Sequence, residues 1–104
     1  MSRREVLAWL AARRPAPPPA LRAQLEASVG DSDERLPEHL ADLGGALLSR
    51  VVAHPQGGRD LALDLLAADA FVTYAFEAQA ELEVAGLAAL AERVTGREGG
   101  GRAA

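Results

Sequence analysis

The chain contains no cysteine, lysine, isoleucine or asparagine among its 104 residues. Without cysteine it has no disulfide bond, no thiolate nucleophile and no zinc–sulfur site, and the redox compartment stays open. All eleven basic residues are arginine, which indicates the bias of a GC-rich, and hence bacterial, genome. Aromatic residues make up only 4% of the chain. A core of closely packed helices with small and aliphatic side chains is therefore expected.

The sequence signatures of common enzyme classes are also missing. No serine stands in the turn that exposes a hydrolase nucleophile. The glycines at 57–58 and 99–101 lack the lysine and the strand–helix setting of a phosphate-binding loop. There are two histidines, His39 and His54, and no Glu-x-x-His pair of the kind that holds iron in helical bundles. The sequence therefore predicts a non-enzymatic protein without a metal or cofactor.

Charge is unevenly distributed along the chain, whose net charge is −4. Residues 1–22 carry five arginines and one acid, whereas residues 23–104 carry six arginines and fourteen acids. An acidic body repels phosphate backbones, which argues against nucleic acid as the partner. The basic N-terminal segment suits an acidic protein surface instead, including the acidic body of a second copy.

The apolar stretches do not have the features of export signals or membrane spans. The stretch 6–12 ends at Arg13 and Arg14, and no small-residue cleavage site follows it. The run 61–76 contains two aspartates and is too short to cross a bilayer. The first predicted helix is also short for a surface anchor, which disfavours membrane contact. A cytoplasmic protein is expected.

Two short helices are predicted in the N-terminal third. Ser2–Glu5 has the S-x-x-E form of a capping box and predicts a helix from about residue 3 to residue 14. The proline-rich stretch 15–19 cannot continue that helix and favours an extended connector. A second helix is expected to begin with proline in its first turn and to stop at Gly30.

A third helix is expected to begin between Asp33 and Pro37 and to end at the turn 54–58. Its apolar stripe consists of Leu36, Leu40, Leu43, Leu47 and Val51. Gly44-Gly45 interrupt the middle of this helix at a cost of about 1 kcal/mol each relative to alanine. We interpret them as a point where a neighbouring backbone comes close; a kink is the alternative.

Residues 60 to about 97 contain no proline, and they predict either one long helix or two helices broken near Gly86. A heptad-like seam runs along this region: Leu61, Leu65, Ala68, Val72, Ala75, Gln79 and Leu82. The predicted fold class is all-α, a bundle of three shorter helices packed against this long C-terminal helix. One domain is expected over 1–96, followed by a flexible glycine-rich tail over 97–104.

Three of the four aromatic residues fall within six positions of the long helical region, yet they do not share a face. Large side chains on several faces of one turn need cover from several directions, which a second copy can supply. The predicted interface consists of Leu65, Val72, Phe71, Tyr74, Phe76 and Leu82. The predicted function is a scaffold or regulatory subunit that acts by protein–protein interaction, as a homodimer or with a larger partner.

Asp69 is the first of the candidate polar residues. It shares a helix face with Leu65 and Val72, so partial burial is expected, with a position at the solvent edge as the alternative. A buried carboxylate needs a partner, and an arginine such as Arg50, or Thr73 on the next turn, is expected to supply it.

Glu77 and Glu81 lie one turn apart on the face that carries Tyr74. With a histidine from another helix, such as His39, they would form a metal site in a bundle, although glutamates at this spacing are usually a solvated face. The alternative function is therefore a small-ligand or metal-binding helical bundle. Its candidate residues are Asp69, Tyr74, Glu77, Glu81 and His39.

Overall fold

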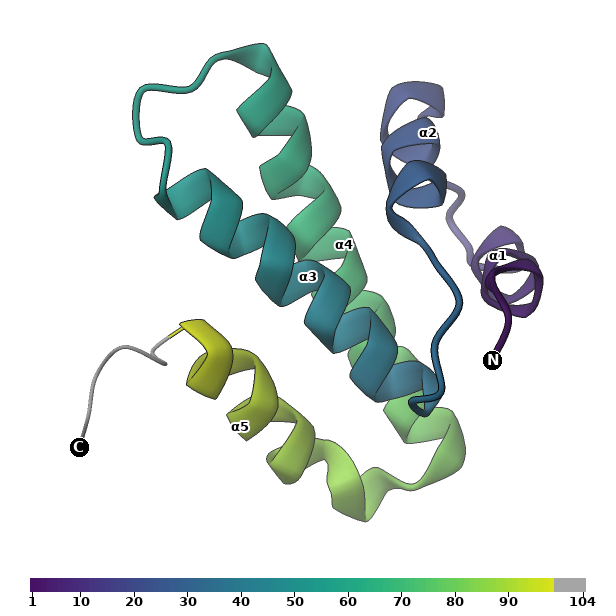
Figure 1. The fold of residues 1–104 in the computed structure, drawn as a ribbon. Helices are drawn as coiled ribbons and strands as arrows, with labels where there is room; N and C mark the ends of the chain where they lie inside the picture. Colours follow the sequence, from purple (N-terminus) through teal and green to yellow (C-terminus); the bar gives the residue numbers. More distant parts are fainter. Residues whose placement is uncertain (99–104) are drawn as a thin grey trace.

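The computed structural model describes residues 1–98 and shows an all-α chain (Figure 1). The elements in order are α1 (Arg3–Ala11), α2 (Pro19–Ser28), α3 (Leu36–Val52), α4 (Arg59–Leu82), the short 3-10 helix η1 (Val84–Gly86) and α5 (Leu87–Glu98). α3 and α4 form a central hairpin, with α1 and α2 on one side of it and α5 on the other. None of these helices is long and apolar enough to cross a membrane.

The predicted capping box at the start of α1 is confirmed. Ser2 Oγ accepts a hydrogen bond from the Glu5 backbone N–H at 3.2 Å, and the Glu5 carboxylate accepts one from the Ser2 N–H at 2.9 Å. The two bonds satisfy amide groups that the first turn of a helix leaves unpaired. α1 ends at Ala11, three residues before the predicted end. Of the three, Arg14 is excluded from the helix because it precedes Pro15. α2 begins with Pro19, as predicted.

The core is made mainly of small and aliphatic side chains, in agreement with the composition. Its buried members are Val6, Leu25, Val29, Leu40, Ala41, Ala67, Phe71, Ala75, Ala78 and Leu90. α3 and α4 can approach closely because Gly44 has no side chain. A Cβ at Gly44 would lie 2.9 Å from Val72 Cγ2 and 3.1 Å from the Ala68 carbonyl oxygen. The interpretation of Gly44 as a point of close backbone approach is confirmed.

The C-terminal helical region is two helices rather than one. α4 ends at Leu82, and Glu83 takes an extended conformation before η1 turns the chain back. Gln79 Nε2 donates to the Glu83 carbonyl oxygen at 2.6 Å, which stabilises the end of α4. A Cβ at Gly86 would lie 2.3 Å from that same Nε2, so a side chain there would displace the Gln79 amide from this position. The all-α class and the alternative of two helices broken near Gly86 are confirmed. The packing of three shorter helices against a long C-terminal helix is wrong, because the longest helix is the fourth of the five α-helices in residues 1–98 and packs mainly on α3.

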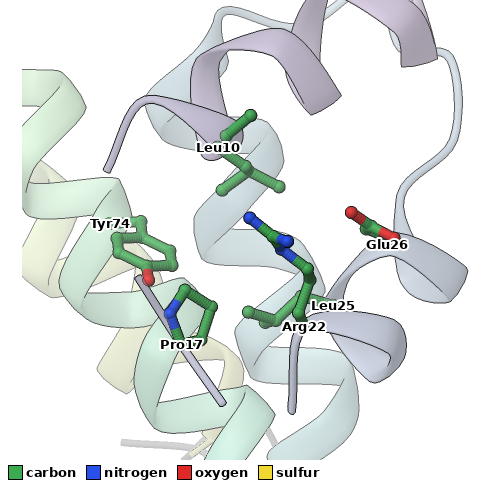
Figure 2. A pocket seen from close by; sticks show the side chains of 7 residues that line it. Leu10, Pro17, Arg22, Leu25, Glu26 and Tyr74 are labelled. Carbon is green, nitrogen blue, oxygen red and sulfur yellow. The ribbon is translucent and has the colours of Figure 1, made fainter. Parts of the chain in front are cut away.

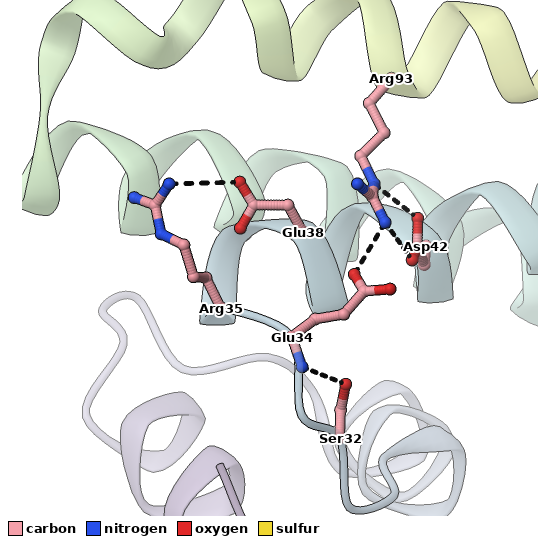
Figure 3. A network of polar contacts seen from close by, with 6 residues as sticks. All are labelled: Ser32, Glu34, Arg35, Glu38, Asp42 and Arg93. Atoms are coloured by element: carbon pink, nitrogen blue, oxygen red, sulfur yellow. Dashed lines mark hydrogen bonds and ion pairs between the residues drawn. The ribbon is translucent and has the colours of Figure 1, made fainter.

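Arg93 ties α5 to α3 in the network that Figure 3 shows. Its Nε and Nη2 donate to the two carboxylate oxygens of Asp42 at 2.9 and 2.8 Å, and Nη2 also donates to Glu34 at 2.7 Å. The hydrogen bonds to Asp42, together with the negative charges of Asp42, Glu34 and Glu38, raise the pKa of Arg93. α5 continues through Glu98, beyond the predicted domain end at residue 96. The rest of the predicted tail lies outside the described residues.

Candidate functional site

The acidic face of α4, which carries Glu77 and Glu81, is contacted by α1 and by Arg13 just after it. The Trp9 and Tyr74 rings meet edge to face with their centroids 6.2 Å apart, and Trp9 Nε1 donates to Glu81 at 3.1 Å. Arg13 Nη1 lies 3.0 Å from a Glu81 carboxylate oxygen and 3.7 Å from one of Glu77. The Arg13 guanidinium also stacks over the Trp9 ring, 3.9 Å from its centroid. This face therefore holds the N-terminal helix in place.

Two pKa values change at this contact. The pKa of Glu81 is lowered, first by the hydrogen bond from Arg13 and then by that from Trp9. Burial raises the pKa of Tyr74, and the nearby Glu77 carboxylate adds to the increase. The charged form of Glu81 and the neutral form of Tyr74 are therefore the ones that fit the docked α1.

Glu81 is expected to make the docking of α1 sensitive to acid. Because its pKa is lower in the docked state, its contribution is complete above the ordinary carboxyl pKa of 4.5 and is lost as the pH falls further. Trp9 is the only tryptophan, so its fluorescence reports this contact directly. Glu81→Gln should weaken docking at pH 7 and reduce the change in emission below pH 4.5, whereas Glu92→Gln on α5 should behave as wild type. An identical acid response in wild type and Glu81→Gln would contradict this role.

Three residues of the alternative polar site, Tyr74, Glu77 and Glu81, lie together at the contact with Trp9 and Arg13, but the other two do not join them. Glu77 and Glu81 are engaged by Arg13, and Asp69 is exposed on a different face of α4. His39 is on α3, where its Nε2 is buried without a hydrogen-bond partner among the described residues. Within residues 1–98, no group of three or more histidine or acidic side chains is placed to hold a metal ion.

The buried carboxylate of α4 is Asp64, and the expected burial of Asp69 is wrong. Asp64 accepts a hydrogen bond from the Gln24 amide of α2, and its other oxygen lies 3.3 Å from Arg50 Nε of α3. Arg50, expected to pair with Asp69, thus pairs with Asp64. The sequence did contain an indication that Asp64 is buried. Asp64 lies four residues, about one helical turn, before Ala68 of the seam, and therefore on the face that packs against α3.

The predicted interface residues have different surroundings. Phe71 is 0% exposed and belongs to the core of its own chain, so it offers no surface to a partner. Tyr74 is partly covered by α1, while Val72 and Phe76 are partly buried. Leu65 and Leu82 are exposed. Only part of the predicted set is therefore available at the surface.

An apolar groove of about 240 Å³ lies where α3, α4 and α5 meet. It is lined by Leu48 of α3, by Leu65, Ala68, Asp69 and Val72 of α4, and by Val94 of α5. Leu65 stands at this groove with 48% of its surface exposed. Asp69 is the one charged residue in this lining. Leu48 and Val94 come from other helices, so sequence periodicity within α4 gave no sign of them.

Two further hollows are less suited to a ligand. A cavity of about 20 Å³ lies between α1, α2 and α4, lined by residues that include Leu10, Leu25 and Tyr74 (Figure 2). That volume holds about one water molecule. A hollow of about 210 Å³ beside Arg35 and Glu38 is lined largely by charged and polar groups, several of which pair with one another.

No protein-family model matches the chain, and no curated protein or solved structure matches it.

Proposed function

We propose that the chain is a non-enzymatic helical interaction protein, a scaffold or regulatory subunit that associates through the apolar groove. The observation that carries this proposal is the convergence of apolar side chains from three helices around the half-exposed Leu65. A partner side chain seated there would remove Leu48, Leu65, Val72 and Val94 from water together. Such an apolar anchor surrounded by near-neutral contacts is typical of the energetic centre of a protein interface.

The proposed association is with a second copy or with a larger protein. Burying a leucine fully contributes about 1.5–3 kcal/mol, so the exposed half of Leu65 supplies roughly 1 kcal/mol. That gain is too small alone, and a stable complex needs about 800 Å² buried on each partner. The interface is therefore expected to extend beyond the groove along the neighbouring surfaces of α3 and α4.

The dimensions of the groove favour a protein over a small ligand. Small-molecule sites are usually enclosed and measure about 300–1,000 Å³. At about 240 Å³ the apolar groove is smaller, and its lining offers one carboxylate, Asp69, as a polar contact. A small-ligand bundle is therefore the second proposal, and a large thermal shift with one ligand class would favour it.

Leu65→Glu should abolish association, and Leu66→Glu is its matched control. The two leucines are neighbours on α4 with similar exposure, 48% and 56%, but only Leu65 lines the groove. A carboxylate at position 65 would have to be desolvated in the complex, whereas one at position 66 would stay in water. Light scattering at high micromolar concentration should give a dimer for wild type and Leu66→Glu and a monomer for Leu65→Glu. A monomeric wild type that also binds no larger partner, or equal association of both variants, would refute the groove as the interface.

A further inference from the structure

Residues 1–32 form one structural unit, here called the N-terminal arm. At one end, the Arg3 side chain donates to the carbonyl oxygens of Val29 at 3.0 Å and Glu26 at 2.9 Å. The N-terminal ammonium donates to the Ser32 carbonyl oxygen at 2.7 Å, and Ser32 N–H donates back to the Met1 carbonyl. α1 and α2 are thus tied together, and a short exposed link, residues 33–35, leads from the arm into α3.

The arm is complementary to α4 at two separate points. At one, Trp9 and Arg13 meet Tyr74, Glu77 and Glu81, as described above. At the other, Gln24 donates to the buried Asp64. In addition, Val6, Leu25 and Val29 of the arm are buried in the same apolar core as Phe71 of α4. The charges match as well, because the basic part of the chain docks on the acidic part.

We propose that this arm is exchangeable between two copies of the chain. The arm of each copy docks on α4 of the other copy, and the two together form a closed two-fold dimer. A second copy is the occupant because its arm carries every group that fits this face. The arm makes the same contacts in the closed monomer and in the exchanged dimer. The two forms therefore differ in free energy mainly through the conformation of the link and the entropy of association. A higher protein concentration shifts the equilibrium toward the dimer.

The charged part of the contact is suited to opening, because the Glu77 and Glu81 side chains are 46% and 52% exposed and such pairs contribute little. Opening also exposes Val6, Leu25 and Val29, which are buried in the closed form. Exchange is therefore slow at room temperature and is accelerated by warming. The link itself is held at the surface by the pair between Glu34 and Arg93, whose side chains are both more than two-fifths exposed.

A charge-reversal mixture of full-length chains tests this exchange. One chain carries Arg13→Glu, and the other carries Glu77→Arg together with Glu81→Arg. Each chain alone places like charges at the contact, whether its arm is closed or exchanged with an identical copy. In the mixture, arm exchange places unlike charges at both contacts. Equal amounts are mixed at high micromolar concentration, warmed and cooled, and measured by light scattering and native mass spectrometry.

The expected result is a particle of twice the 10.9 kDa chain mass that contains one copy of each variant, formed well above the statistical share. A chain with all three substitutions should regain the ion pairs across its own contact and should not prefer a mixed pair, although arginine at position 81 cannot accept the hydrogen bond from Trp9 Nε1. Arg4→Glu, which makes the same charge change at an exposed position of α1, should not pair with the second chain. Groove-mediated dimers would form without preference for the mixed pair, so the two proposals fail separately.

Separate chains after mixing, or mixed pairs only at the statistical share, would overturn arm exchange. If a variant does not fold alone, circular dichroism decides: recovery of helix on mixing supports exchange, and a mixture that remains unfolded overturns it.

Discussion

Phe71→Ala is expected to lower the free energy of unfolding by roughly 3–5 kcal/mol, which is enough to unfold much of a small domain at room temperature. Phe71 is 0% exposed and is the largest fully buried side chain of the described residues. Its ring fills the space between α4 and its neighbours in a closely packed core whose other members are alanines, valines and leucines, none of which is large enough to fill the cavity left by the ring.

Urea denaturation followed by circular dichroism measures this effect, with Leu66→Ala as the matched control. Leu66 stands on the same helix with 56% exposure and lines none of the hollows described above, so its truncation should change stability by less than about 1 kcal/mol. Similar losses for Phe71→Ala and Leu66→Ala would show that the centre of the core lies elsewhere.

Gly44→Leu is expected to cost roughly 3 kcal/mol, or to prevent folding. Leucine favours a helix over glycine by about 1 kcal/mol, but the substitution places a side chain where the Ala68 carbonyl and Val72 now touch α3. Helix backbone cannot move aside without separating α3 from α4, so the clash outweighs the gain in propensity.

Ala46→Leu is the control for Gly44→Leu, since Ala46 lies two residues further along α3 and is exposed. Thermal melts should show Ala46→Leu within about 0.5 kcal/mol of wild type. A stabilised Gly44→Leu chain would mean that α3 and α4 do not approach each other at this point.

The features that could be predicted from the sequence are those decided over a few residues. The Ser2–Glu5 capping box depends on groups three positions apart, and the start of α2 depends on the backbone angle that Pro19 fixes. The role of Gly44 was also predictable. A glycine inside a long helix lowers its stability relative to alanine, so its presence there indicates that a neighbouring segment occupies the space that a side chain would fill. The capping box and the start of α2 depend on residues close together in the sequence. Glycine inside a helix has few structural explanations other than a close approach or a kink.

The side of α4 that faces the core was predicted less accurately. Three members of the predicted seam, Ala68, Ala75 and Gln79, are indeed buried, but Leu65 and Leu82 are exposed. Asp64 and Phe71, which the seam left out, are buried beside the three. The difference arises because Gly44 brings α3 against this face, and because Arg50 and Gln24 compensate the buried carboxylate of Asp64. Such partners come from other helices, so one helix read alone gives no information about them.

The role of Glu77 and Glu81 also depended on a distant segment. On α4 alone, two like charges one turn apart indicate a solvated face. Trp9 on α1 and Arg13 just after it stand more than sixty positions earlier, and their four-residue spacing matches that of the two glutamates. The opposite charges of the two ends of the chain were visible in the sequence, but the docking of one on the other required the fold.

The central claim, that the apolar groove is an interface, is tested most directly by the methyl resonances of the leucines and valines as the full-length chain is concentrated. Leu48, Leu65, Val72 and Val94 line the groove, whereas Leu66 is exposed outside it. With association through the groove, the methyl signals of the four lining residues should shift together between low and high micromolar concentration, or on addition of the larger partner, while those of Leu66 stay in place. Association accompanied by shifts elsewhere and none in the groove would contradict the account.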